Sequence, residues 1–450
     1  MNDTLTTRPR MVICALKERN KDLKKKDRQL KYCKMASAPL VFYRGTNHLF
    51  WDDFASDKRL KHFGNAKTQT WLQGDLHAYN FGSYDNAQGE IVYDLNDFDE
   101  TIYADYQYDL WRMAVSLVLV ARQNDDLSTS QMEKVVDAFS QTYLDTLTLY
   151  RKNKKNASET YFTQEETYGK LNRFLESVKD EYTRKEMLKK WAPKDKQDRR
   201  RFNVKKRPTK LGEASDDERE RILKEMTDYR ETLNNDLAKD DAYFEVKDIV
   251  RRLAAGTGSL GTPRFYVLIE GGKHGDPDDN RILDVKRQTR PTAYKYLDKE
   301  VQRENDERYK NDGERHAKAY RLLTRHTDPH LGWMKLDDDY YSVRERSPFK
   351  EAFPCEALDT RTAFSELAEQ WAEILATDHT CANEELPGLV HTLTDDQDQA
   401  FLDLVREIAF RYADQVRDDW QHFVAALELQ PGECEPLPFA PPSYRNMLPG

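Results

Sequence analysis

The sequence is poor in cysteine and contains no long apolar run, and both absences narrow the class of protein. Its five cysteines are scattered among 450 residues and form no Cys-x-x-Cys pair, which argues against a disulfide framework and a zinc ribbon. The best apolar segment, residues 114–121, is far shorter than the roughly 18 to 20 residues that span a bilayer. The opening residues MNDTLTTRPRM lack the pattern of a secretory signal. We therefore expect a cytoplasmic protein without a membrane partner.

Length and charge distribution indicate several parts. A chain of 450 residues exceeds the roughly 250 to 300 residues that one hydrophobic core supports, so two or more lobes are expected. Apolar residues make up 38% and charged residues 34%, which is enough for closed cores under a strongly charged surface. The net charge is -9, yet residues 151–210 hold 20 Lys and Arg against 9 Asp and Glu.

The basic run within that stretch, residues 194–210, has two interpretations. It is either a surface for an acidic partner or for nucleic acid phosphates, or part of a solvated insertion or lid that covers residues 151–245. No base-reading motif accompanies it, so no sequence-specific nucleic acid partner is predicted.

Local patterns predict an α+β fold. Residues 69–99 alternate short apolar runs with Gly and Asp, as strands joined by functional loops do. Two apolar runs, 265–269 and 282–285, flank the turn-rich EGGKHGDPDDN and predict a β-hairpin. Apolar residues at spacings of three and four predict a helix after residue 105. Later helices are expected over 313–325, 361–378 and 397–427, which makes the last quarter mostly helical.

A first set of polar residues points to phosphoryl transfer. Asp75 is followed five residues later by Asn80, and Asp97 comes at the end of a predicted strand. This chemistry needs a carboxylate to orient the attacking hydroxyl and oxygen ligands to hold magnesium on the phosphates. We assign the first role to Asp75 and the second to Asn80 and Asp97. Strand alternation places Asp99 on the face of Asp97, so it is a further candidate metal ligand.

A second set suggests a phosphate-binding hairpin. Glycines in a tight loop let backbone amides approach anionic oxygens, and a Lys on the returning strand adds a positive charge. The loop precedes a β run, whereas a dinucleotide-binding loop opens a helix. The candidate nucleotide-binding residues are Gly256, Gly258, Ser259, Gly261 and Lys286.

Several longer stretches resemble a known family. They are FYRG (42–45), GDLHAYNFG (74–82), DLNDFDET (94–101), DLWRMAVSL (109–117), GTGSLGTPRFYVLIEG (256–271), LDVKRQ (283–288), DPHLGW (328–333) and YADQVRDDW (412–420). Together they resemble a group of uncharacterised bacterial proteins that is catalogued as a domain of unknown function. That group is assigned to the protein-kinase-like superfamily, near the aminoglycoside and choline phosphotransferases.

This resemblance implies a two-lobe kinase-like fold that uses ATP and Mg²⁺ on an unknown acceptor. It places Asp75 where those kinases keep the catalytic Asp, and Asn80 and Asp97 where they keep metal ligands. Lys286 falls where they keep the strand Lys. Asp109 resembles the buried Asp that braces the catalytic loop.

Three further residues have supporting roles with alternatives left open. Arg44 either reaches phosphate or pairs with a carboxylate, and His77 is either a metal ligand or a packing and hydrogen-bonding residue. Kinases also hold the strand Lys with a helical carboxylate, for which Glu314 is one candidate among Glu300, Glu304 and Glu307. Histidines 316, 326, 330 and 379 show no metal-ligand spacing, so no zinc site is predicted.

The sequence departs from familiar kinases in two ways. Gln73 stands where a His is expected, and the catalytic loop precedes the glycine-rich loop instead of following it. The second departure implies a circular permutation, which is physically tolerable where termini lie close together. The expected parts are 1–150 for the catalytic and metal loops, 151–245 for the insertion, 246–345 for the nucleotide lobe and 346–450 for the helical remainder.

Three alternative functions stay open. AMP instead of phosphate could move in the same pocket. A pseudokinase would bind ATP, or only share the fold, and act as an interaction module. A metallophosphoesterase is suggested by GDLH, but its Gly-Asn-His-Asp motif is matched only in part, by residues 45–48.

Overall fold

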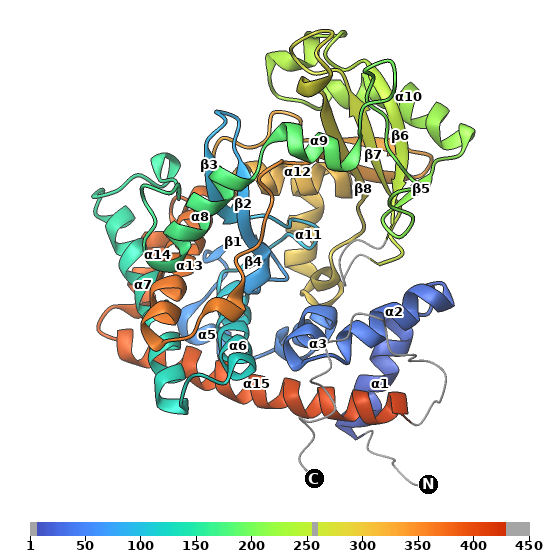
Figure 1. Ribbon diagram of the computed structural model, residues 1–450. Helices are drawn as coiled ribbons and strands as arrows, with labels where there is room; N and C mark the ends of the chain where they lie inside the picture. The colour runs from blue at the N-terminus through green and yellow to red at the C-terminus, as the bar shows by residue number, and fades with distance from the viewer. Residues whose placement is uncertain (1–6, 254–259, 429–450) are drawn as a thin grey trace.

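A computed structural model describes residues 7–253 and 260–428. Figure 1 shows a mostly helical lobe and a smaller lobe built on a sheet. The largest core cluster lies in the helical lobe, while two separate clusters lie on the two faces of the sheet. The expected α+β class with a mostly helical C-terminal part is confirmed. No helix among the described residues is both long and apolar enough to span a membrane.

The sheet lobe contains six antiparallel strands in the order β5-β6-β7-β8-β10-β9. Their apolar side chains alternate, so that Ile249 and Val267 face one core cluster whereas Val250 and Leu268 face the other. The strands are β5 (Leu211–Glu213), β6 (Val246–Arg252), β7 (Arg264–Ile269), β8 (Arg281–Arg287), β9 (Gly332–Leu336) and β10 (Asp339–Glu345). The pairing of β7 with β8 confirms the predicted hairpin.

The helical lobe contains two small antiparallel sheets, β1 with β4 and the hairpin of β2 with β3. These strands are β1 (Gln69–Leu72), β2 (Phe81–Asp85), β3 (Ile91–Leu95) and β4 (Ile102–Asp105). The helices are α5 (Leu60–Phe63), α6 (Gln107–Asn124), α7 (Thr129–Arg151), α8 (Gly169–Glu181), α13 (Arg361–Ala382), α14 (Leu386–Thr394) and α15 (Asp398–Glu428). The apolar stripe predicted after residue 105 is the buried α6, whose residues 107–121 are all buried.

Four short helices at the N-terminal end lie against α15 and beneath the sheet lobe (Figure 1). They are α1 (Arg8–Arg19), α2 (Lys25–Met35), α3 (Pro39–Gly45) and α4 (Asn47–Phe54). Phe423 of α15 packs on Tyr32 and Phe42, with ring centroids 5.6 and 5.3 Å apart. Packing against the far end of the chain thereby fixes these helices beside the rest of the molecule.

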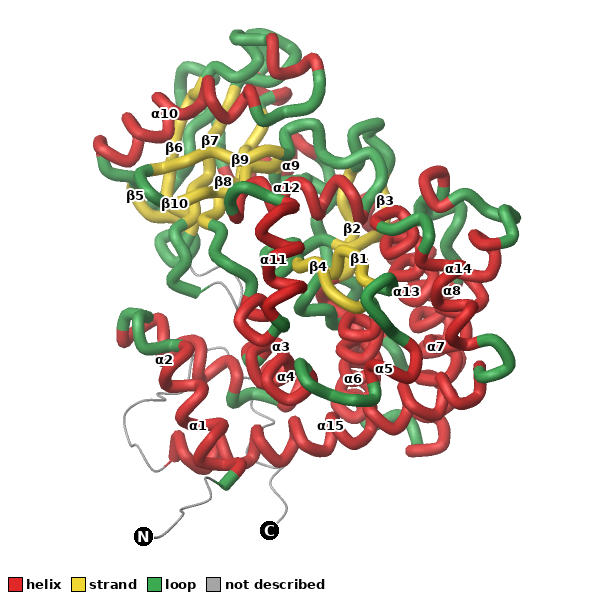
Figure 2. The backbone as a smooth tube through the Cα atoms, turned by 180° about the vertical axis from the view of Figure 1, so that it is seen from behind, coloured by secondary structure: helices red, strands yellow, loops and turns green. Residues whose placement is uncertain are grey.

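Two helices join the lobes, as seen from behind in Figure 2. They are α11 (Lys299–Arg308) and α12 (Asp312–Leu323). The fully buried Arg315 of α12 donates hydrogen bonds to the carbonyls of Asp99, at 2.9 Å, and Thr289, at 3.1 Å. One side chain therefore ties the loop after β3 in the helical lobe to the loop after β8 in the sheet lobe.

Residues 151–245 do not form one separate body. Helix α8 packs on α13 of the helical lobe, whereas α9 (Arg184–Trp191) and α10 (Asp216–Glu231) cover the two faces of the sheet. Part of the basic run is used internally, because the buried Arg200 donates a 2.5 Å hydrogen bond to Asp278. An acidic partner for the rest of this run stays a prediction.

Candidate functional site

A cavity of about 220 Å³ lies where the helical lobe, the sheet lobe and the N-terminal helices meet. Its walls include five residues that the sequence singled out from distant segments: Asp75, Asn80, Asp97, Asp99 and Lys286. Tertiary folding therefore brings the early acidic loops and the late strand Lys to one place.

The loop that carries Asp75 is held by a buried carboxylate. Asp109, at the start of α6, accepts hydrogen bonds from the backbone amides of Gln73, at 2.6 Å, and Gly74, at 3.0 Å. Gly74 has a φ of +80°, and a Cβ atom there would lie 2.1 Å from the carbonyl oxygen of Glu100. Only glycine fits this turn, because the backbone at Glu100 passes directly beside it. Asp109 thus fixes the backbone just before Asp75 through two hydrogen bonds.

Gln73 links the two acidic loops. Its side-chain amide donates to the carbonyl of Asp97 at 2.6 Å, and its side-chain oxygen accepts from the amide of Asp75 at 2.8 Å. Gln73 therefore joins the Asp75 loop to the Asp97 loop through two hydrogen bonds.

Asp75 lies in an unusual electrostatic environment. Its carboxylate contacts the guanidinium of the fully buried Arg112, which projects from α6. Burial raises the pKa of the Asp75 carboxyl to about 7, although the Arg112 charge opposes this shift. A carboxyl with a pKa near neutrality is suited to receive a proton during a reaction.

Asn80 and His77 shape the same loop by different contacts. The Asn80 side-chain amide donates to the carbonyl of Asp75 at 2.9 Å, so its oxygen is the atom left to face a cation. His77 Nδ1 accepts from the amide of Tyr79 at 3.2 Å. Burial lowers the pKa of His77 well below its usual value, so the imidazole is neutral, and its Nδ1 contact fits the hydrogen-bonding interpretation.

Lys286 of β8 finds its counter-charge in Asp99. Its ammonium contacts the Asp99 carboxylate, which also accepts a 3.0 Å hydrogen bond from Gln288. Burial opposes ionisation, but the Lys286 charge nevertheless holds the pKa of Asp99 far below its usual range. The Lys partner is thus a loop carboxylate, where the sequence suggested a helical Glu.

Glu314 lies in α12 with partners of its own. Its carboxylate accepts from the amide of Lys310 at 2.8 Å and pairs with Lys318 at 3.0 Å. The proposal that Glu314 holds Lys286 is therefore corrected: its carboxylate is committed to its own helix. Arg44 lines the cavity, and its guanidinium lies over the Tyr79 ring at 4.7 Å.

The predicted glycine loop lies only partly within the described residues. Gly256, Gly258 and Ser259 lie outside the described residues. Gly261 is described, with a φ of +82° and a would-be Cβ only 2.8 Å from the Leu23 side chain. The end of this loop thus lies beside the turn between α1 and α2.

The sequence reasoning missed the contribution of the N-terminal helices. Six of their residues line the cavity: Arg19, Lys31, Arg44, Gly45, Asn47 and His48. Arg44 was a candidate, and residues 45–48 were considered only for the metallophosphoesterase alternative. Lys31 sits in a helix with many lysines, so no signal in the sequence distinguishes it, whereas Asn47 and His48 follow the FYRG stretch after a gap of one residue.

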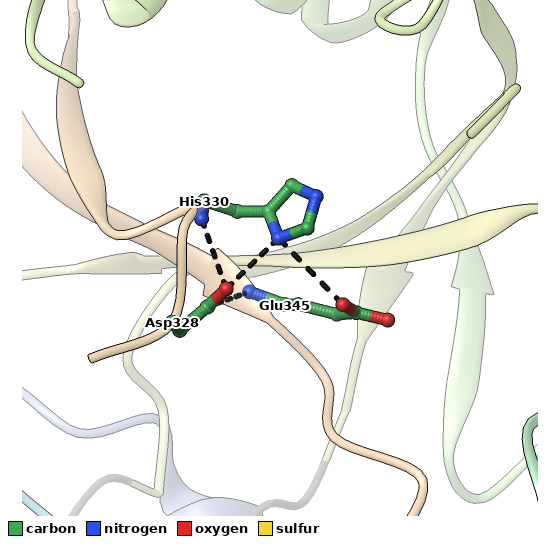
Figure 3. A group of neighbouring side chains, drawn as sticks. All are labelled: Asp328, His330 and Glu345. Carbon is green, nitrogen blue, oxygen red and sulfur yellow. Dashed lines mark hydrogen bonds and ion pairs between the residues drawn. The ribbon is translucent and has the colours of Figure 1, made fainter. Parts of the chain in front are cut away.

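A second polar cluster lies in the sheet lobe and is drawn in Figure 3. Asp328, His330 and Glu345 place one potential metal-ligand atom each within 4.8 Å of the others. However, His330 Nδ1 lies 2.8 Å from Asp328, and His330 Nε2 lies 2.7 Å from the Tyr243 hydroxyl. Glu345 also contacts Arg184. Because each group has a protein partner, we interpret this cluster as an internal ion-pair network.

The comparisons with known proteins give one result. Neither a curated protein nor a solved structure matches this chain. A family described as "Uncharacterized protein conserved in bacteria (DUF2252)" matches residues 24–426. That span includes every residue that lines the cavity except Arg19. The chain therefore belongs to this bacterial family of unknown function.

Proposed function

We propose that the protein is a Mg²⁺-dependent, kinase-like phosphotransferase that moves the γ-phosphoryl group of ATP to an acceptor hydroxyl. One observation carries the proposal. Asp75, Asn80, Asp97 and Lys286 line a single cavity, although Lys286 and its partner Asp99 are 187 positions apart. This is the set of groups that phosphoryl transfer requires.

The donor atoms at the cavity suit magnesium. Asp97 offers a carboxylate, and Asn80 offers the amide oxygen that its hydrogen bond to Asp75 leaves over. Hard oxygen ligands of this kind are those that Mg²⁺ takes together with substrate phosphates. When bound, the ion would neutralise charge on the transferring group. Asp99 would join the ligands only after it separates from Lys286.

The residues around the cavity then have separate roles in the transfer. Asp75 orients the acceptor hydroxyl and takes its proton as the hydroxyl oxygen bonds to the γ-phosphorus. The bond from that phosphorus to the β,γ-bridging oxygen breaks, and ADP leaves. Lys286 supplies positive charge to the phosphates from β8. Gln73 keeps the loops of Asp75 and Asp97 in register.

The fold and chain order support a permuted kinase-like arrangement. An antiparallel sheet that carries Lys286 lies beside a helical lobe, and the acidic loops flank the β2–β3 hairpin of that lobe. In sequence the acidic loops come first and the sheet strands come later. In the proposed permutation, the lobe with the acidic loops therefore precedes the sheet lobe in sequence, which is the reverse of the order in familiar kinases.

The test compares two substitutions for their separate effects on binding and turnover. Lys286→Met should weaken binding of magnesium with a non-hydrolysable ATP analogue by about tenfold or more, because a charge on the phosphates is lost. Asp75→Asn should reduce ATP turnover by about 10³-fold while leaving that binding within about twofold. Lys335→Met, on the exposed side of β9, is the matched control. The reverse pattern would overturn the assignment.

Labelled ATP separates the possible reactions. A product that retains the γ-label from ATP supports phosphoryl transfer, whereas retention of the α-label shows AMP transfer in the same pocket. Nucleotide binding without any turnover, unaffected by Asp75→Asn, would instead indicate a pseudokinase.

A further inference from the structure

Three cationic side chains of the N-terminal helices line the cavity, apart from the β8 wall that carries Lys286. Arg19 ends α1, Lys31 lies in α2 and Arg44 lies in α3. None of them belongs to the loops or strands that the proposed phosphoryl transfer uses. Their role therefore calls for a separate explanation.

Two of these cations form no ion pair with a described residue. Lys31 is only 6% exposed, and no carboxylate of the described residues lies within 4.0 Å of its ammonium. Arg44 is partly buried and likewise forms no ion pair within the described residues, and its buried Nε atom has no hydrogen-bond partner. Burial, reinforced by the nearby Arg19, lowers the pKa of Lys31 to about 8. Burying cations in this way is costly unless a partner completes the site.

Two neutral side chains beside them carry unpartnered atoms, although Asn47 Nδ2 donates a 3.1 Å hydrogen bond to the Gly74 carbonyl. Asn47 Oδ1 and His48 Nε2 are buried, line the cavity and form no hydrogen bond within the described part of the chain. These side chains are 7% and 5% exposed. Buried polar atoms nearly always have partners, so several unpartnered ones in one cavity wall indicate a polar ligand.

Three of the four carboxylates of the cavity already have partners, and the fourth, Asp97, is the proposed metal ligand. Asp75 contacts Arg112, and Asp99 contacts Lys286. Glu100 accepts a 2.6 Å hydrogen bond from the Thr292 amide and a 3.0 Å bond from its hydroxyl, and only Arg19, at 3.9 Å, reaches it from the cationic group. A bound anion would supply the close negative partner that Lys31 and Arg44 lack.

We propose that Lys31 and Arg44, aided by Arg19, bind a phosphate monoester group of the acceptor. The acceptor is then a small phosphorylated molecule with a free hydroxyl, and this statement rests on the proposed phosphotransferase function. Guanidinium and ammonium groups together match a dianionic phosphate. Asp75 and Lys31 line the same cavity, so a phosphate held by Lys31 would bring the hydroxyl of the same molecule to the proposed base.

Burial limits the size of the acceptor. A side chain that is 6% exposed is inaccessible to a phosphorylated residue on the surface of a folded protein. A small metabolite-sized molecule can enter the cavity, and its binding would supply the charge that the described residues do not.

The experiment uses inorganic phosphate as the probe and calorimetry on the full chain. Lys31→Met and Arg44→Met should each weaken phosphate binding by about tenfold, since each removes one charge-assisted contact. Lys26→Met changes an exposed lysine of the same helix and should leave the affinity unchanged. Thermal melts of all variants establish that each is folded.

Nucleotide binding gives the second measurement. Both variants should bind magnesium with a non-hydrolysable ATP analogue as the wild type does, within about twofold. If Lys31→Met weakens phosphate and the analogue by the same factor, these cations hold the phosphates of ATP and the proposal is wrong. Unchanged phosphate affinity in Lys31→Met would also overturn it.

A carboxylate ligand is the remaining competitor. Oxalate should compete with phosphate only weakly, whereas equal competition would show a carboxylate site and contradict the phosphate assignment. Phosphate binding needs no turnover, so these outcomes are independent of the tests on Asp75 and Lys286. The final expected result is that a phosphorylated sugar stimulates ADP release and its unphosphorylated form does not.

Discussion

Two buried polar clusters in this molecule differ in how completely the chain satisfies them. In the Asp328, His330 and Glu345 cluster, each titratable group contacts a protein partner. In the cavity wall formed by the N-terminal helices, buried atoms of Arg44, Asn47 and His48 have none among the described residues. The first cluster resembles a metal site by distance alone, yet only the second leaves groups free for a ligand.

The difference shows that the hydrogen-bond and ion-pair partners of polar groups indicate a ligand site better than the distances between those groups do. Three potential ligand atoms close together are also what an ion-pair network produces, and such a network stabilises a fold without binding anything. Unpartnered buried groups lower the stability of the ligand-free protein, and only a ligand that hydrogen-bonds to them removes this penalty. Substitutions in the two clusters should therefore have opposite consequences for stability and activity.

The largest expected effect follows from Asp97→Asn in the cavity. Loss of the carboxylate should reduce ATP turnover by about 10³-fold, because a metal ligand is removed. The Asp97 contact with Gln73 uses the backbone carbonyl, so the melting temperature should hardly change. Turnover assays with parallel thermal melts measure both. Turnover at the wild-type rate would exclude Asp97 from the site.

Glu345→Gln, in the satisfied cluster, should behave in the opposite way. The carboxylate is mostly buried and contacts Arg184, with Arg281 at 3.7 Å. Removing its charge leaves Arg184 with only Asp85, at 3.7 Å, as a partner and should lower the free energy of unfolding by about 2 to 3 kcal/mol. Urea denaturation measures this loss, and turnover per folded molecule should stay unchanged. Glu351→Gln, at an exposed position, is the control.

Gln73→Ala tests the link between the two acidic loops of the cavity. It removes both hydrogen bonds that join the Asp75 and Asp97 loops, so turnover should fall by about tenfold to thirtyfold through misplacement of the reacting groups. Gln73→Glu keeps the acceptor for the Asp75 amide but loses the donor to Asp97. Its turnover should therefore lie between those of the wild type and Gln73→Ala. Equal turnover in all three proteins would show that the bridge does not position the loops.

The charge of Lys31 predicts a pH effect on phosphate binding. Because burial lowers its pKa to about 8, the ammonium loses its proton as the pH rises through that value. Arg19, Asp75 and Glu100 are the charged groups that influence it. Phosphate affinity, measured by calorimetry, should fall a few-fold between about pH 7 and about pH 9. Lys31→Met should remove this dependence, whereas an identical decline in Lys31→Met would assign it to another group.

The smallest effect concerns the stability of the His330 cluster. Burial opposes protonation, but Asp328 and Glu345 raise the pKa of His330 above its usual value. The stabilisation is therefore fully present below the unfolded pKa of about 6.5 and disappears as the pH rises through the higher folded pKa. The difference in unfolding free energy between wild type and His330→Gln should shrink from about pH 6 to about pH 9. A difference that grows with pH would contradict this.

The sequence predicted the local elements well because their signals are local. The β7–β8 hairpin follows from two apolar runs around a turn, and α6 follows from its apolar spacing. The loop from Asp75 to Asn80 was recognisable by its residue types and spacing. The function assigned to it stays a prediction until the substitutions above are measured.

The sequence was less successful in predicting contacts between residues that are far apart in the chain. The partner of Lys286 was sought in the helices after β8, but it is Asp99, from a loop far earlier in the chain. The segment 151–245 was expected to be one insertion, yet its helices divide between the lobes. Neither outcome has a local signal, because which carboxylate meets an ammonium depends on how the lobes dock.

The sequence by itself determined the strands, the helices and the acidic loop, since hydrophobic periodicity and turn residues act over a few positions. Only the tertiary structure decided which cations face the cavity. Lys31 differs from its neighbouring lysines in being buried beside Arg44 and His48, and burial is a property of packing. The physical reason is that the cost of an unpaired buried charge arises only after folding has removed the water around it.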